Sequence, residues 1–113
     1  MDSNTKTLLI KRLAKNLPFL RKKMHLTQDE LAKQIGVSRI TINTIEKEER
    51  MTWGRFTSIM MVLTSSKEMC RLLKELEIYD IELEKLFKRT TLIIEKKDQS
   101  VLVGSKFDLV KKL

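Results

Sequence analysis

Two helix-start signals and one helix-stop signal fall within the short stretch between Thr27 and Ser38. Thr27 and Glu30 have the spacing of a capping box, in which each side chain accepts a hydrogen bond from a free backbone N–H of the other residue. Gly36 predicts the end of this helix, because glycine adopts the left-handed cap conformation without strain. Ser38 then predicts the N-cap of a second helix. A turn this short predicts two helices that cross steeply.

Apolar residues recur at the spacing of amphipathic helices along residues 5–87. We expect helices at 5–15, 17–23, 28–35, 39–47, 52–63, 66–76 and 81–87. Asn16 and Pro18 separate the first two, because asparagine caps a new helix and proline is tolerated only in a first turn. The sequence therefore predicts a mostly α fold, with a five-helix domain at 13–66 and an N-terminal helical extension at 1–12.

The pattern changes from residue 90 onward, where TLIIE and SVLVG are β-branched runs joined by KKDQ. Such runs predict a β-hairpin over residues 91–104. A short helix is expected in the terminal SKFDLVKKL, in which Ser105 and Asp108 match a capping box. Residues 67–113 are therefore interpreted as a helical and β-hairpin extension, which we expect to serve dimerisation or partner binding.

The net charge is +8, and the excess lies mainly in the first half of the chain: residues 1–50 carry 11 basic and 6 acidic side chains, residues 51–113 carry 12 and 9. This charge favours nucleic acid as a partner, and an anionic membrane surface second. Cys70 and His25 are the only residues of their types, so neither an internal disulfide nor a Cys/His metal site is expected, and no cofactor. The longest apolar run, IMMVL, cannot span a bilayer, and no signal peptide is visible, so we expect a soluble, cytoplasmic protein.

The helix expected at 39–47 has two distinct faces. Ile42 and Ile45 face a core, whereas the outer face combines a cation, an amide, a hydroxyl and a branched apolar side chain. These chemistries suit base edges in a major groove, where arginine pairs with guanine, asparagine with adenine, and aliphatic carbon contacts the thymine methyl group. The pattern also fits a polar face with one incidentally exposed isoleucine, or an Ile40 packed under residues 48–52.

The stretch LTQDELAKQIGVSRITINTIEKEE, at residues 26–49, resembles the helix-turn-helix of the lambda-repressor and Cro superfamily, also called the XRE family. The residues that carry the resemblance are Leu26, Thr27, Gln28, Leu31, Ala32, Ile35, Gly36, Val37, Ser38, Ile42, Ile45 and Glu46. The resemblance implies a lambda-repressor-like fold over residues 13–66 and sequence-specific binding to double-stranded DNA.

The resemblance also implies roles for single residues. The helix at about 39–47 is the expected recognition helix, which lies in the major groove. The positions expected to contact bases are Arg39, Ile40, Asn43 and Thr44. Arg21 and Glu46 match a partly buried ion pair between the first helix and the recognition helix.

Contacts to the DNA backbone are expected from a second group of residues. Gln28 matches a residue that contacts a phosphate and braces the recognition helix, and Thr27 is expected to add a contact through its hydroxyl or N–H. Lys47 and Arg50 are expected to contribute through their charge.

The sequence departs from the family pattern at two turns. His25 stands where the family usually has a glycine before the first motif leucine. After Glu46, where a glycine often follows, the chain continues with Lys47, Glu48, Glu49 and Arg50. We therefore expect either a longer recognition helix or a loop with another path.

The resemblance implies a transcriptional regulator, usually a repressor, that binds operator DNA as a homodimer. The alternative is an antitoxin that represses its own operon and binds a toxin protein through residues 67–113. No arrangement of side chains suggests an enzyme, and membrane binding through the basic helix at 6–15 ranks below DNA binding. Either DNA-binding role predicts a bacterial or phage-type protein associated with the nucleoid.

Overall fold

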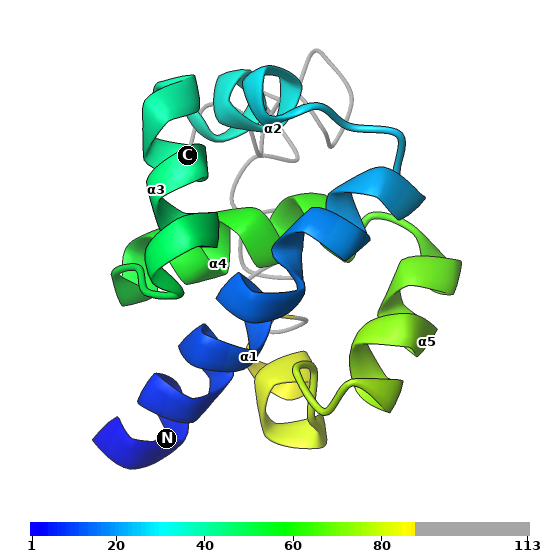
Figure 1. Cartoon of the computed structure of the whole chain (residues 1–113). Helices are drawn as coiled ribbons and strands as arrows, with labels where there is room; N and C mark the ends of the chain where they lie inside the picture. Colours follow the sequence, from blue (N-terminus) through cyan, green and yellow to red (C-terminus); the bar gives the residue numbers. More distant parts are fainter. Residues whose placement is uncertain (88–113) are drawn as a thin grey trace, which may run out of the picture. The chain divides into compact units, whose positions relative to one another are not determined.

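The structure, a computed structural model, describes residues 1–87, which are helical apart from caps and turns (Figure 1). Five helices lie in a first compact unit, residues 1–79: α1 (Ser3–Lys23), α2 (Gln28–Ile35), α3 (Arg39–Glu48), α4 (Trp53–Leu63) and α5 (Lys67–Glu75). Residues 81–87 form a further short helix in a second unit that begins at Asp80. The prediction of a mostly α fold is confirmed. The expected hairpin at 91–104 and the terminal helix lie outside the described residues.

The predicted break between two N-terminal helices is wrong, because α1 runs without interruption through Pro18. Asn16 does not cap a helix; its side-chain amide instead donates to the carbonyl oxygen of Arg12 at 2.8 Å. Buried leucines lie on both sides of the proline, with Leu13, Leu17 and Leu20 all fully buried. Tertiary packing on both sides of Pro18 therefore outweighs the loss of one backbone hydrogen bond. Residues 3–12 of the expected 1–12 extension belong to this same helix.

The caps of α2 and α3 have the predicted chemistry. Both hydrogen bonds of the capping box are present, from Thr27 N–H to Glu30 and from Glu30 N–H to Thr27, each at 3.0 Å. Gly36 caps α2 in the left-handed conformation with φ 75°. The hydroxyl of Ser38 accepts from the N–H of Thr41 at 3.2 Å and caps α3. These caps fix the start of α3 relative to the end of α2.

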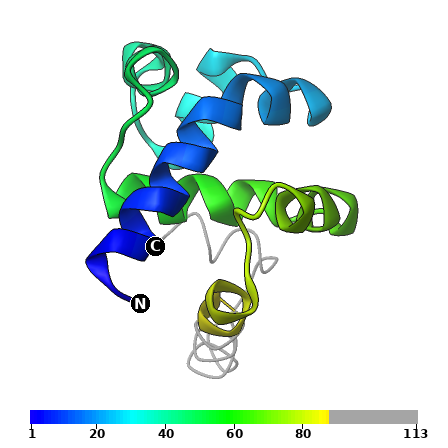
Figure 2. The ribbon, with the colours of Figure 1, turned by 60° about the horizontal axis from the view of Figure 1, so that its bottom comes forward.

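The core of the first unit lies where α1, α2, α3 and α4 meet. α2 packs against α3 and α4, and α1 packs against the same two helices. Figures 1 and 2 both show α1 crossing α4. The fully buried side chains of α2, α3 and α4 include Leu31, Ile42, Phe56, Ile59, Met60 and Leu63. Ile42 and Ile45 thus face the core as predicted, and the opposite face of α3 is left outward.

The N-terminal half of α1 is anchored to α4. Leu9 is buried, and the ammonium of Lys6 lies 5.1 Å from the centre of the Trp53 ring. Trp53 in turn stacks on Phe56 with ring centres 4.6 Å apart. Since cation–π and stacking contacts add to the area buried, this half of α1 is part of the compact unit.

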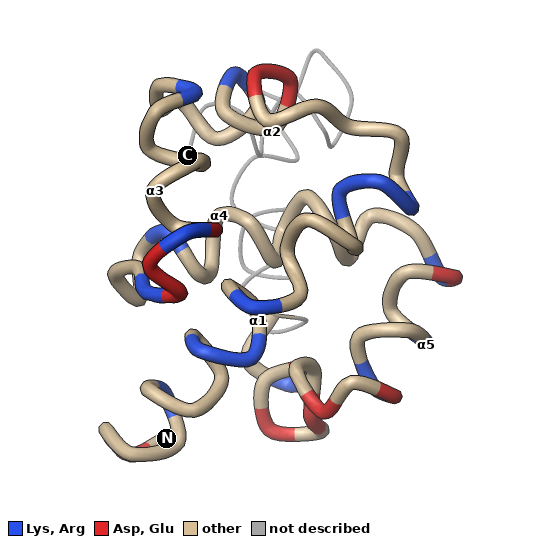
Figure 3. The backbone as a smooth tube through the Cα atoms, in the orientation of Figure 1, with Lys and Arg blue, Asp and Glu red and all other residues tan. Residues whose placement is uncertain are grey.

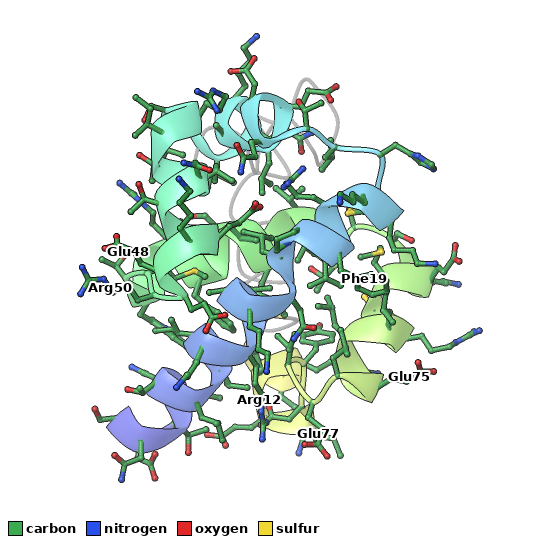
Figure 4. The ribbon with its side chains drawn as sticks, viewed as in Figure 1. Arg12, Phe19, Glu48, Arg50, Glu75 and Glu77 are labelled. Atoms are coloured by element: carbon green, nitrogen blue, oxygen red, sulfur yellow. The ribbon has the colours of Figure 1, made fainter. Side chains whose placement is uncertain are left out.

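The later helices begin at the expected residues. Thr52 caps α4, Ser66 caps α5, and the carboxylate of Asp80 accepts from the N–H of Leu83 at 2.8 Å. Figure 4 shows Arg12 of α1 beside Glu77, which follows α5. Arg12 donates to the carbonyl oxygen of Glu77 at 2.9 Å, so a side chain of α1 ties down the chain after α5.

Two of the turns flanking the helix-turn-helix hold non-glycine residues in the left-handed region. His25 has φ 57° and Glu49 has φ 53°. Glu49 caps α3, so the helix ends at Glu48 and does not extend through residues 49 and 50. The chain therefore keeps the backbone shape that glycine favours and accepts the steric cost of a side chain there.

We predict that Glu49→Gly raises the free energy of unfolding by about 1 kcal/mol, because it removes the left-handed strain. Glu48→Gly, one residue earlier and inside the helix, is the matched control and should lower it by about 1 kcal/mol. Denaturant unfolding monitored by circular dichroism measures both. Equal effects of the two glycines would contradict the assignment of strain to residue 49.

Candidate nucleic-acid interface

The outer face of α3 is open to solvent in the described structure. Arg39, Ile40, Thr44 and Lys47 are exposed, and Asn43 is half-buried. Ile40 is 68% exposed, more than any other large apolar side chain of α1 to α5. The interpretation that Ile40 packs under residues 48–52 is therefore wrong. The structure brings the four expected base-contacting side chains together on one face of α3.

Gln28, the first residue of α2, links the two motif helices. Its side-chain amide donates to Glu46 at 2.9 Å and lies 3.4 Å from the carbonyl oxygen of the Asn43 side chain. The guanidinium of Arg39 lies 3.5 Å from the side-chain oxygen of Gln28. The last two contacts are at the long end of hydrogen-bond geometry, so they leave Arg39 and Asn43 able to turn toward another partner.

Behind this face, Arg21 of α1 and Glu46 of α3 form a bidentate ion pair. The two N···O distances are 2.6 and 3.1 Å, and the side chains are only 11% and 8% exposed. Arg21 also donates to the carbonyl oxygen of Leu26 at 2.9 Å. With the bond from Gln28, both carboxylate oxygens of Glu46 are occupied, so this network fixes α3 against α1 and the start of α2.

The capping box restricts what Thr27 can offer to a ligand. Its N–H already donates to Glu30, and its hydroxyl oxygen accepts from the N–H of Glu30. The hydroxyl hydrogen is the donor that can turn from the Glu30 carboxylate to an outside acceptor. The bond from the Thr27 N–H, followed by the contact with the Thr27 hydroxyl, lowers the pKa of the Glu30 carboxyl. Thr27 therefore holds the Glu30 carboxyl ionised. This stabilises folded α2 at pH values above the pKa that this carboxyl has in the unfolded chain.

The C-terminal end of α3 carries charges of both signs. Lys47 is exposed and makes no ion pair with any residue between 1 and 87. Arg50 lies 3.3 Å from the carboxylate of Glu48, and Figure 4 shows the two side chains next to each other. Both are largely exposed, so the pair is weak and a phosphate can replace Glu48 as the partner of Arg50.

Positive charge is concentrated on α1. Within Ser3–Lys23 there are seven lysines and arginines and no acidic residue, and Figure 3 shows the blue segments along this helix. Arg12 and Arg21 have acidic partners, whereas Lys22 and Lys23, at the end that leads to α2, form no ion pair with the described residues. The helix-turn-helix is therefore bordered by cations, which raises the local attraction for a polyanion.

Residues 19–52 match a family model described as helix-turn-helix. The matched segment starts in α1, contains α2 and α3, and ends before α4. The match supports a helix-turn-helix of the lambda-repressor/Cro type in this segment. The family is a DNA-binding family and not an enzyme family, so the helix-turn-helix supports DNA binding and transcription regulation. No curated protein and no solved structure matches the chain.

Several contacts of the helix-turn-helix were not anticipated from the sequence. One example is the hydrogen bond from Arg21 to the Leu26 carbonyl oxygen, and another is the ion pair between Arg50 and Glu48. The spacing of Glu48 and Arg50 gives no helical signal, because the helix ends between them. Among residues 1–87, no group of three or more His, Cys, Asp or Glu could hold a metal ion, and no helix is long and apolar enough to cross a membrane.

Proposed function

We propose that this protein binds double-stranded DNA at specific sequences by placing the outer face of α3 in the major groove. The observation that carries the proposal is that the exposed Arg39, Ile40 and Thr44 share one face with the half-buried Asn43, on a helix whose other face is buried in the core. Cationic, amide, hydroxyl and apolar groups together can distinguish all four base pairs. Residues near the start of a recognition helix are those that contact base edges.

Backbone contacts in this proposal come from both ends of the helix-turn-helix. The Thr27 hydroxyl and Gln28 lie at the start of α2, and Lys47 and Arg50 lie at the end of α3. Contacts of this kind set the position of the protein on the duplex without distinguishing bases. The Arg21–Glu46 pair has no direct role in binding and holds the two groups of contacts in register.

We propose further that the protein acts as a homodimeric repressor at the nucleoid. A single module of this size buries little surface on DNA, and helix-turn-helix proteins commonly bind paired half-sites about one helical turn, roughly 34 Å, apart. Residues 67–113 are the region proposed to join the two copies. A repressor needs only to occupy an operator, which the features of α3 support without a further effector site.

We predict that Arg39→Ala weakens binding to the preferred duplex by about 1–3 kcal/mol and relaxes the preference at one base pair, because one bidentate base contact is lost. The matched control is Lys33→Ala on α2, whose ammonium pairs with Asp29 at 3.2 Å. It should leave the base preference unchanged. Fluorescence anisotropy on the preferred duplex and its single-base variants measures both; an unaltered preference in Arg39→Ala would reject the base contact.

The dimer predicts a mass in solution twice that of the 13.3 kDa chain. A shortened chain that ends near residue 90 should have the mass of a single shortened chain, if the region after it joins the copies. Light scattering coupled to size exclusion measures both. A shortened chain with twice its own monomer mass would exclude a dimer held by the expected hairpin.

The antitoxin role is a narrower version of the same DNA-binding function. It adds one requirement, a protein partner for residues 67–113, and it keeps every role assigned to α3. A small toxin-like reading frame beside the gene, and co-purification of its product with this protein, would favour that version over an autonomous repressor.

A further inference from the structure

Ile40 lies on the outer face of α3, where no residue between 1 and 87 buries it. It is 68% exposed, while Ile42 and Ile45 of the same helix are 0% and 4% exposed. The helix therefore does not need Ile40 for its core. An exposed branched apolar side chain between Arg39 and Asn43 can gain free energy only from an apolar group brought to it.

The position of this side chain is fixed before any ligand arrives. Ile40 lies in the first turn of α3, where the Ser38 hydroxyl accepts from the N–H of Thr41 and lies 3.0 Å from the Thr41 hydroxyl. A β-branched side chain in a helix has one strongly preferred χ1 rotamer. Both backbone and side chain are thus ordered in advance, so little conformational entropy is lost on contact.

One apolar group is exposed on base edges in the major groove, and it is the methyl group on C5 of thymine. We infer that Ile40 contacts a pyrimidine C5-methyl group and that binding therefore depends on that methyl group. This inference rests on the proposed insertion of α3 into the major groove. The methyl group of 5-methylcytosine occupies the same position on the ring, so cytosine methylation at this site should strengthen binding.

The test uses four pyrimidines at each position of the preferred duplex where thymine is selected: thymine, uracil, cytosine and 5-methylcytosine. The two pairs, thymine against uracil and 5-methylcytosine against cytosine, differ only in the C5-methyl group. When one such position is changed in a single half-site, the duplex with the methylated pyrimidine should bind about four-fold more tightly than its unmethylated counterpart. This factor corresponds to the free energy gained when one methyl group is removed from water. A dimer with both half-sites changed should show about a fifteen-fold difference by the same reasoning.

The four duplexes are measured with the full chain and two variants. Ile40→Ala removes an exposed side chain, so it leaves the core intact, and it should reduce both methyl effects to near one-fold. Arg39→Ala is the matched control, and it should weaken binding to all four duplexes while retaining both methyl effects.

Two results would overturn the inference: no position with a methyl effect, or a methyl effect that persists in Ile40→Ala. Neither would remove the sequence preference itself, so both leave the proposed function standing. Absence of any preferred sequence would instead reject the proposed function together with the inference.

Discussion

Replacing Arg21 by alanine lowers the free energy of unfolding by about 3–5 kcal/mol, because Glu46 is left buried without its charge partner. The loss of stability is large because the Arg21 and Glu46 side chains are only 11% and 8% exposed and are joined by two hydrogen bonds. The carbonyl oxygen of Leu26 loses its donor in the same variant. Urea unfolding followed by circular dichroism measures the change.

Arg12→Ala is the matched control for this prediction. Arg12 is also an arginine of α1, but its nearest contact with the Glu77 carboxylate is 3.5 Å and that carboxylate is 75% exposed. Pairs of this kind contribute about 0–1 kcal/mol. The double variant Arg21→Met with Glu46→Leu should regain most of the stability, because no unpaired charge remains. Equal losses for Arg21→Ala and Arg12→Ala would show that the buried pair does not hold α3 in place.

Raising the salt concentration from 50 to 200 mM weakens DNA binding by about 150-fold if Lys47 and Arg50 each neutralise one phosphate in both copies of a dimer. About four phosphates then release their counterions, and the slope of log K against log salt is near −3.6. Both side chains are free to reach a phosphate, since Lys47 forms no ion pair within residues 1–87 and Arg50 is held only by the exposed Glu48.

Lys47→Gln should make that slope shallower by about 1.8, since it removes about two phosphate contacts from the dimer. Lys67→Gln on α5 changes the net charge equally and is the control, with an expected slope like that of the unchanged protein. Glu48→Gln should strengthen binding, because Arg50 no longer has to leave a carboxylate. A slope that responds equally to Lys47→Gln and Lys67→Gln would contradict a phosphate contact at the end of α3.

Helix ends were predictable wherever a side chain bonds to the backbone close by in sequence. Thr27 and Ser38 illustrate this, because their capping bonds depend only on residues within one turn. The end of α2 at Gly36 was predictable from the left-handed conformation that glycine favours. Pro18 shows the limit of such local reasoning. Whether proline ends a helix depends on how strongly the flanking turns are packed, and the burial of Leu17 and Leu20 is not visible in local sequence.

The residues of the candidate site could be predicted from the sequence, but the contacts between them could not. The helical spacing predicts that Ile40 faces outward, yet only the structure shows that no segment between α3 and residue 87 covers it. The bonds from Gln28 toward Glu46 and Asn43 join residues that are 18 and 15 positions apart. Such contacts depend on the crossing of α2 and α3. The left-handed Glu49 was likewise hidden, since glutamate gives no sequence signal for that conformation.

The most direct measurement of the central claim is selection of bound duplexes from a random pool, carried out in parallel with the unchanged protein, Arg39→Ala and Ile40→Ala. The claim predicts a palindromic consensus with half-sites about one helical turn apart. It also predicts that each variant loses preference at its own base pair while the remaining positions are kept. A pool without enrichment, or a consensus identical in all three proteins, would contradict base recognition by α3.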